Sequence, residues 1–522
     1  MFRVLFLFLI LIAGCQKSTT DISHTLKINL GMDPQTLDPR KARDLSTITL
    51  MHMVFEGLTR TSRTGDVEMA LAKGVEISED GLQYVFHLRK SHWSNGDLVT
   101  SADFAHSWKS ILDPHFPTDV AYQLYPIKNA HKIKIGELEA DQLGVLTPDP
   151  QTLVVQLEQP IPYFLEALSL SIFFPVPHQV VTANPDWALD PSTHVCNGPF
   201  SIKSWKHSDQ LQVEKNPHYW EAKEVKLEGI DLYMVASDTE IRMFEEGKLN
   251  WAGSPLSVIP IDAVAKLKEM EKLQVSPLCG TYFFRVNTEK KPLSNASFRR
   301  ALAIAIDREG IAEHILQGGQ APAKSLVPPQ MDLSKGGYFP DCQQETAYSL
   351  LMEALLELDL TMENLGPIAI SYCSSERNAS IAQAIQKQWE ETLDLHVELE
   401  AVEPKVFFQR LSKKEYQLAA GSWTADFNDP INFLEVFKYK EASTNNTNWE
   451  SSKYIDLLNR STLCRDVNER KQILREAEQI LMDQMPIIPV FHFALNYLQQ
   501  EELKEVVLSP IGQVDFRWAE IR

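Results

Sequence analysis

From about residue 279 to residue 490, the sequence alternates between two hydrophobic periodicities. Residues 367–372 and 395–401 are short stretches with apolar side chains at the spacing typical of strands, and residues 378–393 between them repeat apolar side chains at helical spacing. A helix between two strands predicts a βαβ unit. The alternation therefore predicts an α/β region in which helices pack against the faces of a sheet.

Residues 61–176 follow a different pattern, typical of hairpins. Tyr84, Phe86 and Leu88 alternate with polar residues, as the side chains of a half-buried strand do. One helix interrupts the hairpins, and Thr100 with Asp103 three residues later predicts a capping box at its start. This stretch therefore predicts a small α+β unit. Because domains usually contain about 100 to 200 residues, a chain of 522 residues predicts more than one compact unit.

Regular structure is expected to begin soon after residue 24. Leu26, Ile28 and Leu30 alternate as a half-buried strand does. Ser46 and Thr47 then precede apolar residues at helical spacing, so we expect one of them to cap that helix.

The first fifteen residues have the pattern of an export signal. Arg3 precedes ten uncharged, mostly apolar residues at 4–13, a run too short for a membrane span of about 20 residues. The run ends in Ile-Ala-Gly-Cys at 12–15, which resembles a bacterial lipoprotein signal, with Cys15 as the lipidated residue. The alternative is a signal followed by an incidental cysteine. We expect an exported protein, lipid-anchored to a bacterial membrane and facing the periplasm or the cell exterior.

Composition and motifs argue against several classes of function. The formal charge of −20 repels phosphate backbones, so nucleic acid is a poor candidate partner. The sequence contains no phosphate loop, dinucleotide fingerprint, zinc-binding helix or nucleophile elbow, so an enzyme is not favoured and no cofactor is predicted. The 14 histidines are scattered singly and there is no C-x-x-C pair, so no metal site is predicted.

Several short sequence blocks follow one another along the chain, at residues 34–39, 55–58, 84–89, 93–97, 197–200, 298–302, 306–308 and 423–430. Together and in this order they resemble the oligopeptide- and dipeptide-binding lipoproteins of ABC importers, the family 5 extracellular solute-binding proteins. The resemblance runs from about Leu26 to the C-terminus.

The resemblance implies a two-lobed α/β periplasmic binding protein fold, type II, of the large peptide-binding class, with an additional small α+β domain. The resemblance also implies the partners: short peptides, an ABC permease with its ATPase subunits, and a membrane contacted through the lipid anchor. It implies a monomer and no nucleic acid. The predicted boundaries are a signal peptide at 1–14, a tether at 15–25, the first lobe at 26–60, 177–278 and 490–522, the small domain at 61–176, and the second lobe at 279–489.

In similar peptide binders, the aspartate of the Trp-x-Ala-Asp block pairs with the ligand's α-amino group, and here that position is Asp426. The alternative is that Asp426 caps a turn before 428–430. Trp423 is a candidate pocket wall, with core packing as the alternative. Asn428, in the same block, is a further candidate ligand contact.

The remaining candidates depend more on position than on motif. Phe491 and His492, together with Phe493, lie where similar proteins place aromatic residues near the cleft; an ordinary strand is the alternative. The family disulfide from the position of Cys279 cannot form, because its partner position is Thr424. Basic residues expected near a ligand carboxylate are absent just before the block, and Arg285 and Arg410 are possible substitutes, with a solvated surface arginine as the alternative.

The sequence therefore predicts a receptor that binds short peptides by their main chain and amino terminus, without chemistry on the ligand. One rival keeps the mechanism and changes the ligand to a cell-wall peptide, a nickel chelate or an opine. A rival from another class is a surface hydrolase or an adhesion lipoprotein.

Overall fold

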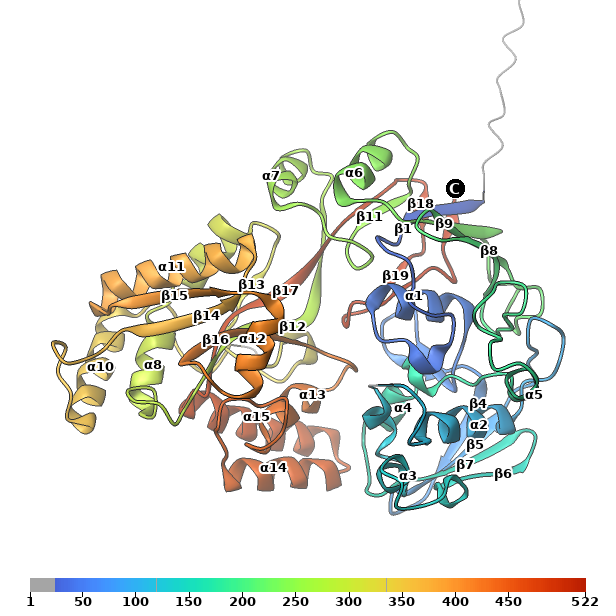
Figure 1. Ribbon diagram of the computed structural model, residues 1–522, viewed down its shortest axis with the longest axis horizontal. Coiled ribbons are helices and arrows are strands. Elements are labelled where there is room, and N and C mark those ends of the chain that lie inside the picture. The colour runs from blue at the N-terminus through green and yellow to red at the C-terminus, as the bar shows by residue number, and fades with distance from the viewer. Residues whose placement is uncertain (1–23, 119, 335) are drawn as a thin grey trace, which may run out of the picture.

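Two large hydrophobic cores divide the protein. The computed structural model describes residues 24–118, 120–334 and 336–522. One core gathers side chains from residues 26–256 and 503–521, which we call the first lobe, and the other gathers side chains from residues 279–491, the second lobe. Figure 1 shows the two lobes side by side, with the long strands β12 (Gln274–Val286) and β17 (Ile487–Gln499) running between them.

Among the described residues, eleven strands form one mixed sheet that passes through both lobes. Its order is β15-β14-β16-β12-β17-β11-β1-β10-β9-β8, with β13 paired to β17. The other nine strands are β1 (Thr25–Asn29), β8 (Phe200–Lys206), β9 (Gln210–Lys215), β10 (Gly229–Tyr233), β11 (Trp251–Gly253), β13 (Ala321–Pro322), β14 (Ile368–Cys373), β15 (Val397–Val402) and β16 (Leu418–Thr424).

The pairing of β12 with β17 is irregular where the strands pass from one lobe to the other. Pro277 lies opposite Ala494 and Thr281 lies opposite His492, so three residues of β12 face one residue of β17. Such a bulge leaves extra residues outside the ladder and bends the strand. The connection between the lobes is thus a continuous sheet with one local weak point at residues 278–280.

The second lobe confirms the predicted α/β pattern. Strands β14 and β15 pair in parallel, and α11 (Glu376–Leu393) connects them, which is the βαβ unit expected from the sequence. The other helices of this lobe are α8 (Ala296–Ile304), α9 (Arg308–Gly310), α10 (Gln344–Leu358), α12 (Pro404–Ser412), α13 (Ile431–Leu434), α14 (Ser452–Leu463) and α15 (Val467–Gln484). Short 3-10 and π segments complete it.

In the first lobe, the predicted hairpins form a separate four-stranded sheet in the order β4-β5-β7-β6. Its strands are β4 (Ala72–Ile77), β5 (Gln83–Leu88), β6 (Val145–Asp149) and β7 (Thr152–Gln156). Helix α2 (Ser101–Leu112) covers it, and the capping box between Thr100 and Asp103 is present, as predicted. The other helices of the lobe are α1 (Leu45–Val54), α3 (Ala130–Lys134), α4 (Phe164–Ala167) and α5 (His178–Ala183). Helices α6 (Ser237–Glu245) and α7 (Ile261–Glu269) pack around a smaller separate core with Leu498 of β17.

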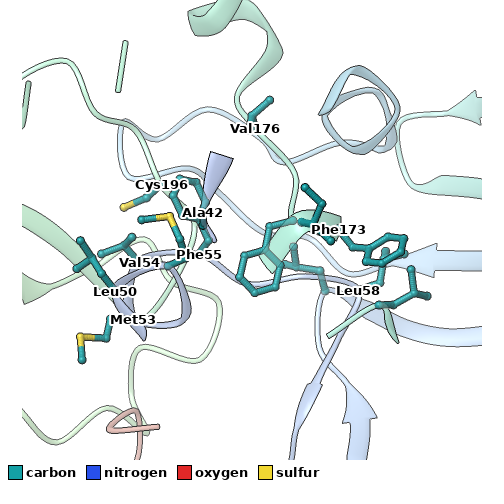
Figure 2. Packing of buried hydrophobic residues seen from close by; sticks show 14 of the residues in the cluster. Ala42, Leu50, Met53, Val54, Phe55, Leu58, Phe173, Val176 and Cys196 are labelled. Atoms are coloured by element: carbon teal, nitrogen blue, oxygen red, sulfur yellow. The ribbon is translucent and has the colours of Figure 1, made fainter. Parts of the chain in front are cut away.

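The small sheet and the rest of the first lobe share one hydrophobic core. Figure 2 shows Val54 and Phe55, at the end of α1, and Phe173 among the buried side chains of that core. The expected cap of α1 was wrong: Asp44, not Ser46 or Thr47, accepts the hydrogen bond from the Thr47 N–H at 2.9 Å. A carboxylate one residue before the helix outcompetes the hydroxyls because it is already charged and close to the free N–H groups.

The C-terminal segment returns to the first lobe. Two short antiparallel pairs form within it: β18 (Leu503–Lys504) pairs with β21 (Glu520–Ile521), and β19 (Val507–Leu508) pairs with β20 (Val514–Asp515). A third short pair, β2 (Thr59–Thr61) with β3 (Val67–Met69), comes just before the small sheet in the sequence. The buried guanidinium of Arg517 lies 2.6 Å from the buried carboxylate of Glu56, so this ion pair ties the C-terminal segment to the segment that follows α1.

The predicted signal, the lipidation at Cys15 and most of the tether lie outside the described residues, and the predicted domain boundaries stay predictions. None of the described helices has the length and the apolar character that a membrane crossing requires.

Candidate functional site

The loop after β16 holds Asp426 at the end of a paired strand. The Ala425 N–H donates to the carbonyl of Cys279 at 2.8 Å, which continues the β12–β16 ladder one step beyond Thr424. The side-chain carbonyl of Asn432 then accepts hydrogen bonds from the indole N–H of Trp423 at 2.9 Å and from the Asp426 N–H at 3.3 Å. Asn432 therefore fixes both predicted site residues relative to the start of α13.

Trp423 and Asp426 line one pocket between the lobes, which we call the Asp426 pocket. Its volume is about 330 Å³. The second lobe contributes Trp423, Asp426, Phe427, Asn432, Glu435, Val436 and Thr444, and the first lobe contributes Tyr122, Gln123, Pro126, Tyr163, Ala167, Leu170 and Phe173. A ligand in this pocket would touch both lobes at once.

The Asp426 pocket is acidic. Burial raises the pKa of Asp426 above its usual value, while a hydrogen bond with the side chain of Asn432 opposes the shift. Burial also raises the pKa of Glu435, against the opposing effect of Lys438. None of the described residues that line the pocket is basic. A bound cation would favour the ionised form of both carboxyls, so the pocket is suited to an ammonium group.

The turn after Asp426 is held by a different carboxylate. Asp429 accepts the Ile431 N–H at 2.9 Å, and its carboxylate pairs with the guanidinium of Arg470 at 2.7 Å. Asp429 therefore caps this turn, which is the role considered as the alternative for Asp426.

The edge of β16 beside this pocket is open. On the side away from β12, β16 pairs with β14 only at Leu418 and Ala419. In an antiparallel pair, alternate residues bond to their direct partner and the residues between them point their N–H and C=O outward. Since Ala425 bonds to β12, Ser422 and Thr424 direct their main-chain groups to the open edge, and both residues are exposed.

A second pocket, of about 350 Å³, lies at the other end of this edge; we call it the Arg285 pocket. Its lining comes entirely from the second lobe: Tyr282, Arg285, Cys373, Arg377, Asn378, Phe407, Phe408, Leu411, Ala420, Gly421, Ser422 and Phe493. The Arg285 side chain is buried and lies over the ring of Phe283 at 5.0 Å from the ring centre. Burial lowers the pKa of Arg285, although the group stays charged at neutral pH.

The structure separates the remaining predicted residues. Asn428 is exposed and does not line the Asp426 pocket; it lines two other pockets between the lobes. Arg410 is exposed on α12 and lies 3.4 Å from Glu400. Phe491 and His492 are buried in the second lobe, where Phe491 stacks on Tyr282 and His492 hydrogen-bonds Thr281 at 2.8 Å. Of the three aromatic positions at 491–493, Phe493 lines the Arg285 pocket.

Sequence reasoning missed the wall that the first lobe contributes. Tyr163 stacks on Phe427 across the interface, with ring centres 4.4 Å apart and planes inclined by 6°. Tyr122 also faces Asp426, whose charge adds to burial in raising the pKa of Tyr122. Isolated tyrosines in a hairpin-rich stretch carry no local signal that would single them out.

Cys279 is buried and unpaired, in agreement with the absence of a partner cysteine at Thr424, and the other four cysteines of the described chain are unpaired as well. Within residues that the structure describes, no group of three or more His, Cys, Asp or Glu side chains is arranged to hold a metal ion.

Two lobes joined by crossing strands, with pockets at their interface, define the class of extracellular binding proteins that enclose a ligand between two lobes. The family model described as "Bacterial extracellular solute-binding proteins, family 5 Middle" matches residues 66–445, and the chain belongs to this family. The family resemblance, the α/β fold and the expectation of a binding protein rather than an enzyme are thereby confirmed. The protein is an extracellular or periplasmic solute-binding protein.

Individual relatives match over nearly their full length. The chain is 39% identical over 500 residues to the oligopeptide-binding protein OppA of Bacillus subtilis, covering 94% of this chain and 92% of that protein. It is 31% identical over 511 residues to the dipeptide-binding protein DppE of the same organism, covering 97% and 93%. Among solved structures, the murein tripeptide binding protein MppA in its unliganded open form matches with a TM-score of 0.84 and 27% identity, covering 96% and 97%.

Proposed function

We propose that this protein is a receptor that captures short peptides between its lobes and delivers them to an ABC permease, from a lipid anchor at Cys15. The observation that carries the proposal is the open edge of β16 next to an acidic pocket. The named activities of OppA and DppE, which bind oligopeptides and dipeptides, support the same ligand class.

The open edge explains how peptides of different sequence could bind. An extended peptide offers one N–H and one C=O per residue, and Ser422 and Thr424 offer the matching groups in an exposed strand. Pairing with the main chain is independent of the side chains, so it favours breadth over sequence specificity. Bridging water in the pockets would preserve polar contacts with varied side chains.

The acidic pocket supplies a preference for one end of the peptide. In this proposal, the ligand's α-ammonium group enters the Asp426 pocket and pairs with the Asp426 carboxylate. The peptide then runs from the Thr424 end of the edge toward the Gly421 end, antiparallel to β16. Tyr122 and Tyr163 of the first lobe, which line the same pocket, would then cover the amino terminus.

Asp426→Asn tests the amino-terminal contact. A hydrogen bond to a charged group contributes about 1.5 to 3 kcal/mol, so the variant should bind a free-amino peptide about ten- to a hundredfold more weakly. Calorimetry with an N-acetylated copy of the same peptide should show little difference between variant and wild type. The matched control is Asp456→Asn, an exposed aspartate of α14. Equal affinity of wild type and Asp426→Asn for the free-amino peptide removes Asp426 from the site.

A cell-wall peptide is the second candidate ligand. The observation that favours it is the TM-score of 0.84 with a murein tripeptide binding protein. Calorimetry with a murein tripeptide beside an ordinary tripeptide separates the two candidates, because only a murein receptor should prefer the diaminopimelate-containing ligand.

A further inference from the structure

Beside the Asp426 pocket, the two lobes border a wider gap of about 890 Å³, which we call the hairpin gap. One wall is formed around the turn between β4 and β5 of the first lobe, and the opposite wall is formed around the corner between α14 and α15 of the second lobe. Pro162 and Asn428 line the gap, and each is the chain neighbour of a ring in the Tyr163–Phe427 stack. The hairpin gap therefore begins where the contact between the lobes ends.

The first-lobe wall is a rigid, acidic turn. The Ser78 N–H donates to the Gln83 carbonyl at 2.9 Å and closes the turn between the two strands. Glu79 and Asp80 are exposed at its tip and line the gap, and Glu166 lines the same wall. None of the described first-lobe residues that line the gap is basic.

The second-lobe wall has one basic residue without a partner. Asp429 lies 2.7 Å from Arg470. Asp332 lies 3.1 Å from Lys471, so both acidic side chains of this wall are paired within their own lobe. Arg465, exposed between α14 and α15, forms no ion pair with any residue that the structure describes. The charge left over on this wall is therefore positive and faces an acidic turn.

The two walls already influence each other electrostatically. Hydrogen bonds from the Ser78 side chain and the Leu82 N–H lower the pKa of Asp80, and the charge of Arg465 lowers it further. Asp80 and Arg465 are thus close enough to interact across the gap, although they are not in contact.

Exposed apolar side chains also face the gap from both walls. Ile77 of the first lobe is 49% exposed, and Leu463 and Val467 of the second lobe are each 67% exposed. Each wall combines apolar with charged side chains, as the two halves of a protein–protein interface do. The walls are therefore complementary in both charge and hydrophobicity.

A rotation of the lobes would bring these walls together. The β12–β17 ladder that joins the lobes is weakest at residues 278–280, and the arrangement of the lobes is similar to the unliganded open form of MppA. In Figure 1 the crossing strands lie above the interface, while α14 and the small sheet lie at its lower end. A small rotation at the crossing strands thus produces a large movement at the gap.

From these observations we propose that the turn between β4 and β5 and the corner between α14 and α15 form a latch. When the lobes close on a peptide, Glu79 and Asp80 pair with Arg465, and the exposed apolar side chains of the two walls pack together. The latch rests on the proposed peptide-binding function and deepens it. Because the apparent affinity scales with the fraction of molecules that are closed, a contact made only in the closed state strengthens binding without touching the peptide.

A disulfide trap tests whether the two walls meet. Cys464 lines the second-lobe wall, so Glu79→Cys places a second thiol opposite it. The whole purified chain is oxidised with diamide, with and without a tetrapeptide library randomised at every position, and mass spectrometry of digests follows the bond between residues 79 and 464. The library should raise the rate of its formation about threefold or more. In the control, Gln151→Cys at the opposite end of the small sheet, no bond to residue 464 should form.

Charge reversal tests the electrostatic part of the latch. At low ionic strength and below saturation, Arg465→Glu should retain about threefold less of the library than wild type, because exposed ion pairs contribute modestly. The deficit should shrink at about 1 M salt, where the screening length is about 3 Å. Adding Glu79→Lys to Arg465→Glu should restore part of the retention. The control Arg460→Glu changes an exposed arginine of α14 that does not line the gap and should match wild type.

The outcomes separate the latch from peptide binding itself. If peptides leave the rate of the 79–464 bond unchanged, the walls do not meet and the latch is wrong, while peptide retention by wild type still supports the receptor. If peptides slow the bond, the gap holds part of the ligand and the latch is equally wrong. Equal retention by wild type and Arg465→Glu at low ionic strength removes Arg465 from the latch. If wild type retains no peptide, both proposals fall. Thermal melts control for folding, and the charge-reversal arm does not depend on the cysteine variant.

Discussion

Glu478 of α15 gives the stability of this protein a pH dependence that one substitution should remove. The side chain is fully buried, accepts the N–H groups of Leu326 and Val327 at 2.9 and 2.7 Å, and accepts the Tyr338 hydroxyl at 2.7 Å. Burial nevertheless dominates these hydrogen bonds and raises the pKa of Glu478 from 4.5 to about 7.

The sign follows from where the proton is bound. Between pH 4.5 and 7 the folded protein holds a proton on Glu478 that the unfolded chain has lost, so the free energy of unfolding falls as pH rises through this window. At about 1.4 kcal/mol per pKa unit, the gap from 4.5 to about 7 corresponds to a loss of about 3 kcal/mol, complete above pH 7. Glu478→Gln cannot ionise, and its amide can still accept the two N–H groups, so it should lack this loss.

Urea unfolding of wild type and Glu478→Gln at several pH values from 4.5 to 8 measures the effect as a difference. The free energy of unfolding of Glu478→Gln, relative to that of wild type, should rise by about 3 kcal/mol from pH 4.5 to pH 8. Other buried carboxyls, such as Asp426, titrate in both proteins, so their contributions cancel in the difference between the two unfolding free energies. Glu476→Gln, an exposed glutamate of the same helix, is the control and should follow wild type. A pH-independent difference between wild type and Glu478→Gln would refute the reasoning.

Two further substitutions test the packing of the first lobe. Gly198→Ala would place a Cβ atom 2.4 Å from the Val54 carbonyl carbon, so it should lower the melting temperature by many degrees, whereas Gly74→Ala, with no atom within 4 Å, should leave it nearly unchanged; similar melting temperatures would contradict the close approach. Arg517→Met removes a buried partner of Glu56 and should cost about 3 kcal/mol or more in unfolding free energy, and a loss below 1 kcal/mol would mean that Arg60 alone suffices.

Features that depend on neighbouring residues could be predicted from the sequence. The βαβ unit around α11 and the capping box of Thr100 follow from local periodicity and local hydrogen bonds, and the structure confirms both. The cap of α1 shows the limit of this reasoning, because Asp44, Ser46 and Thr47 all suit the role and only the backbone path decides among them.

The candidate site could be predicted only in part, because its two walls lie about 300 residues apart in the chain. The motif singled out Asp426 and Trp423, but Tyr122 and Tyr163 reach the same pocket only through the arrangement of the lobes. Arg285 was one of two candidate arginines. Its unusual environment depends on the register that sets it beside Gly421, and no local pattern encodes that register.

The order in which the chain emerges bears on how the lobes are completed. Glu56 and Arg517 are 461 residues apart, and side chains from 503–521 fill the same core as residues 26–256. A polypeptide delivered across a membrane N-terminus first would hold an unfinished first lobe until its last twenty residues arrive, whereas the contiguous second lobe could close its core earlier. Loss of only the final segment would therefore damage the part of the protein that is made first.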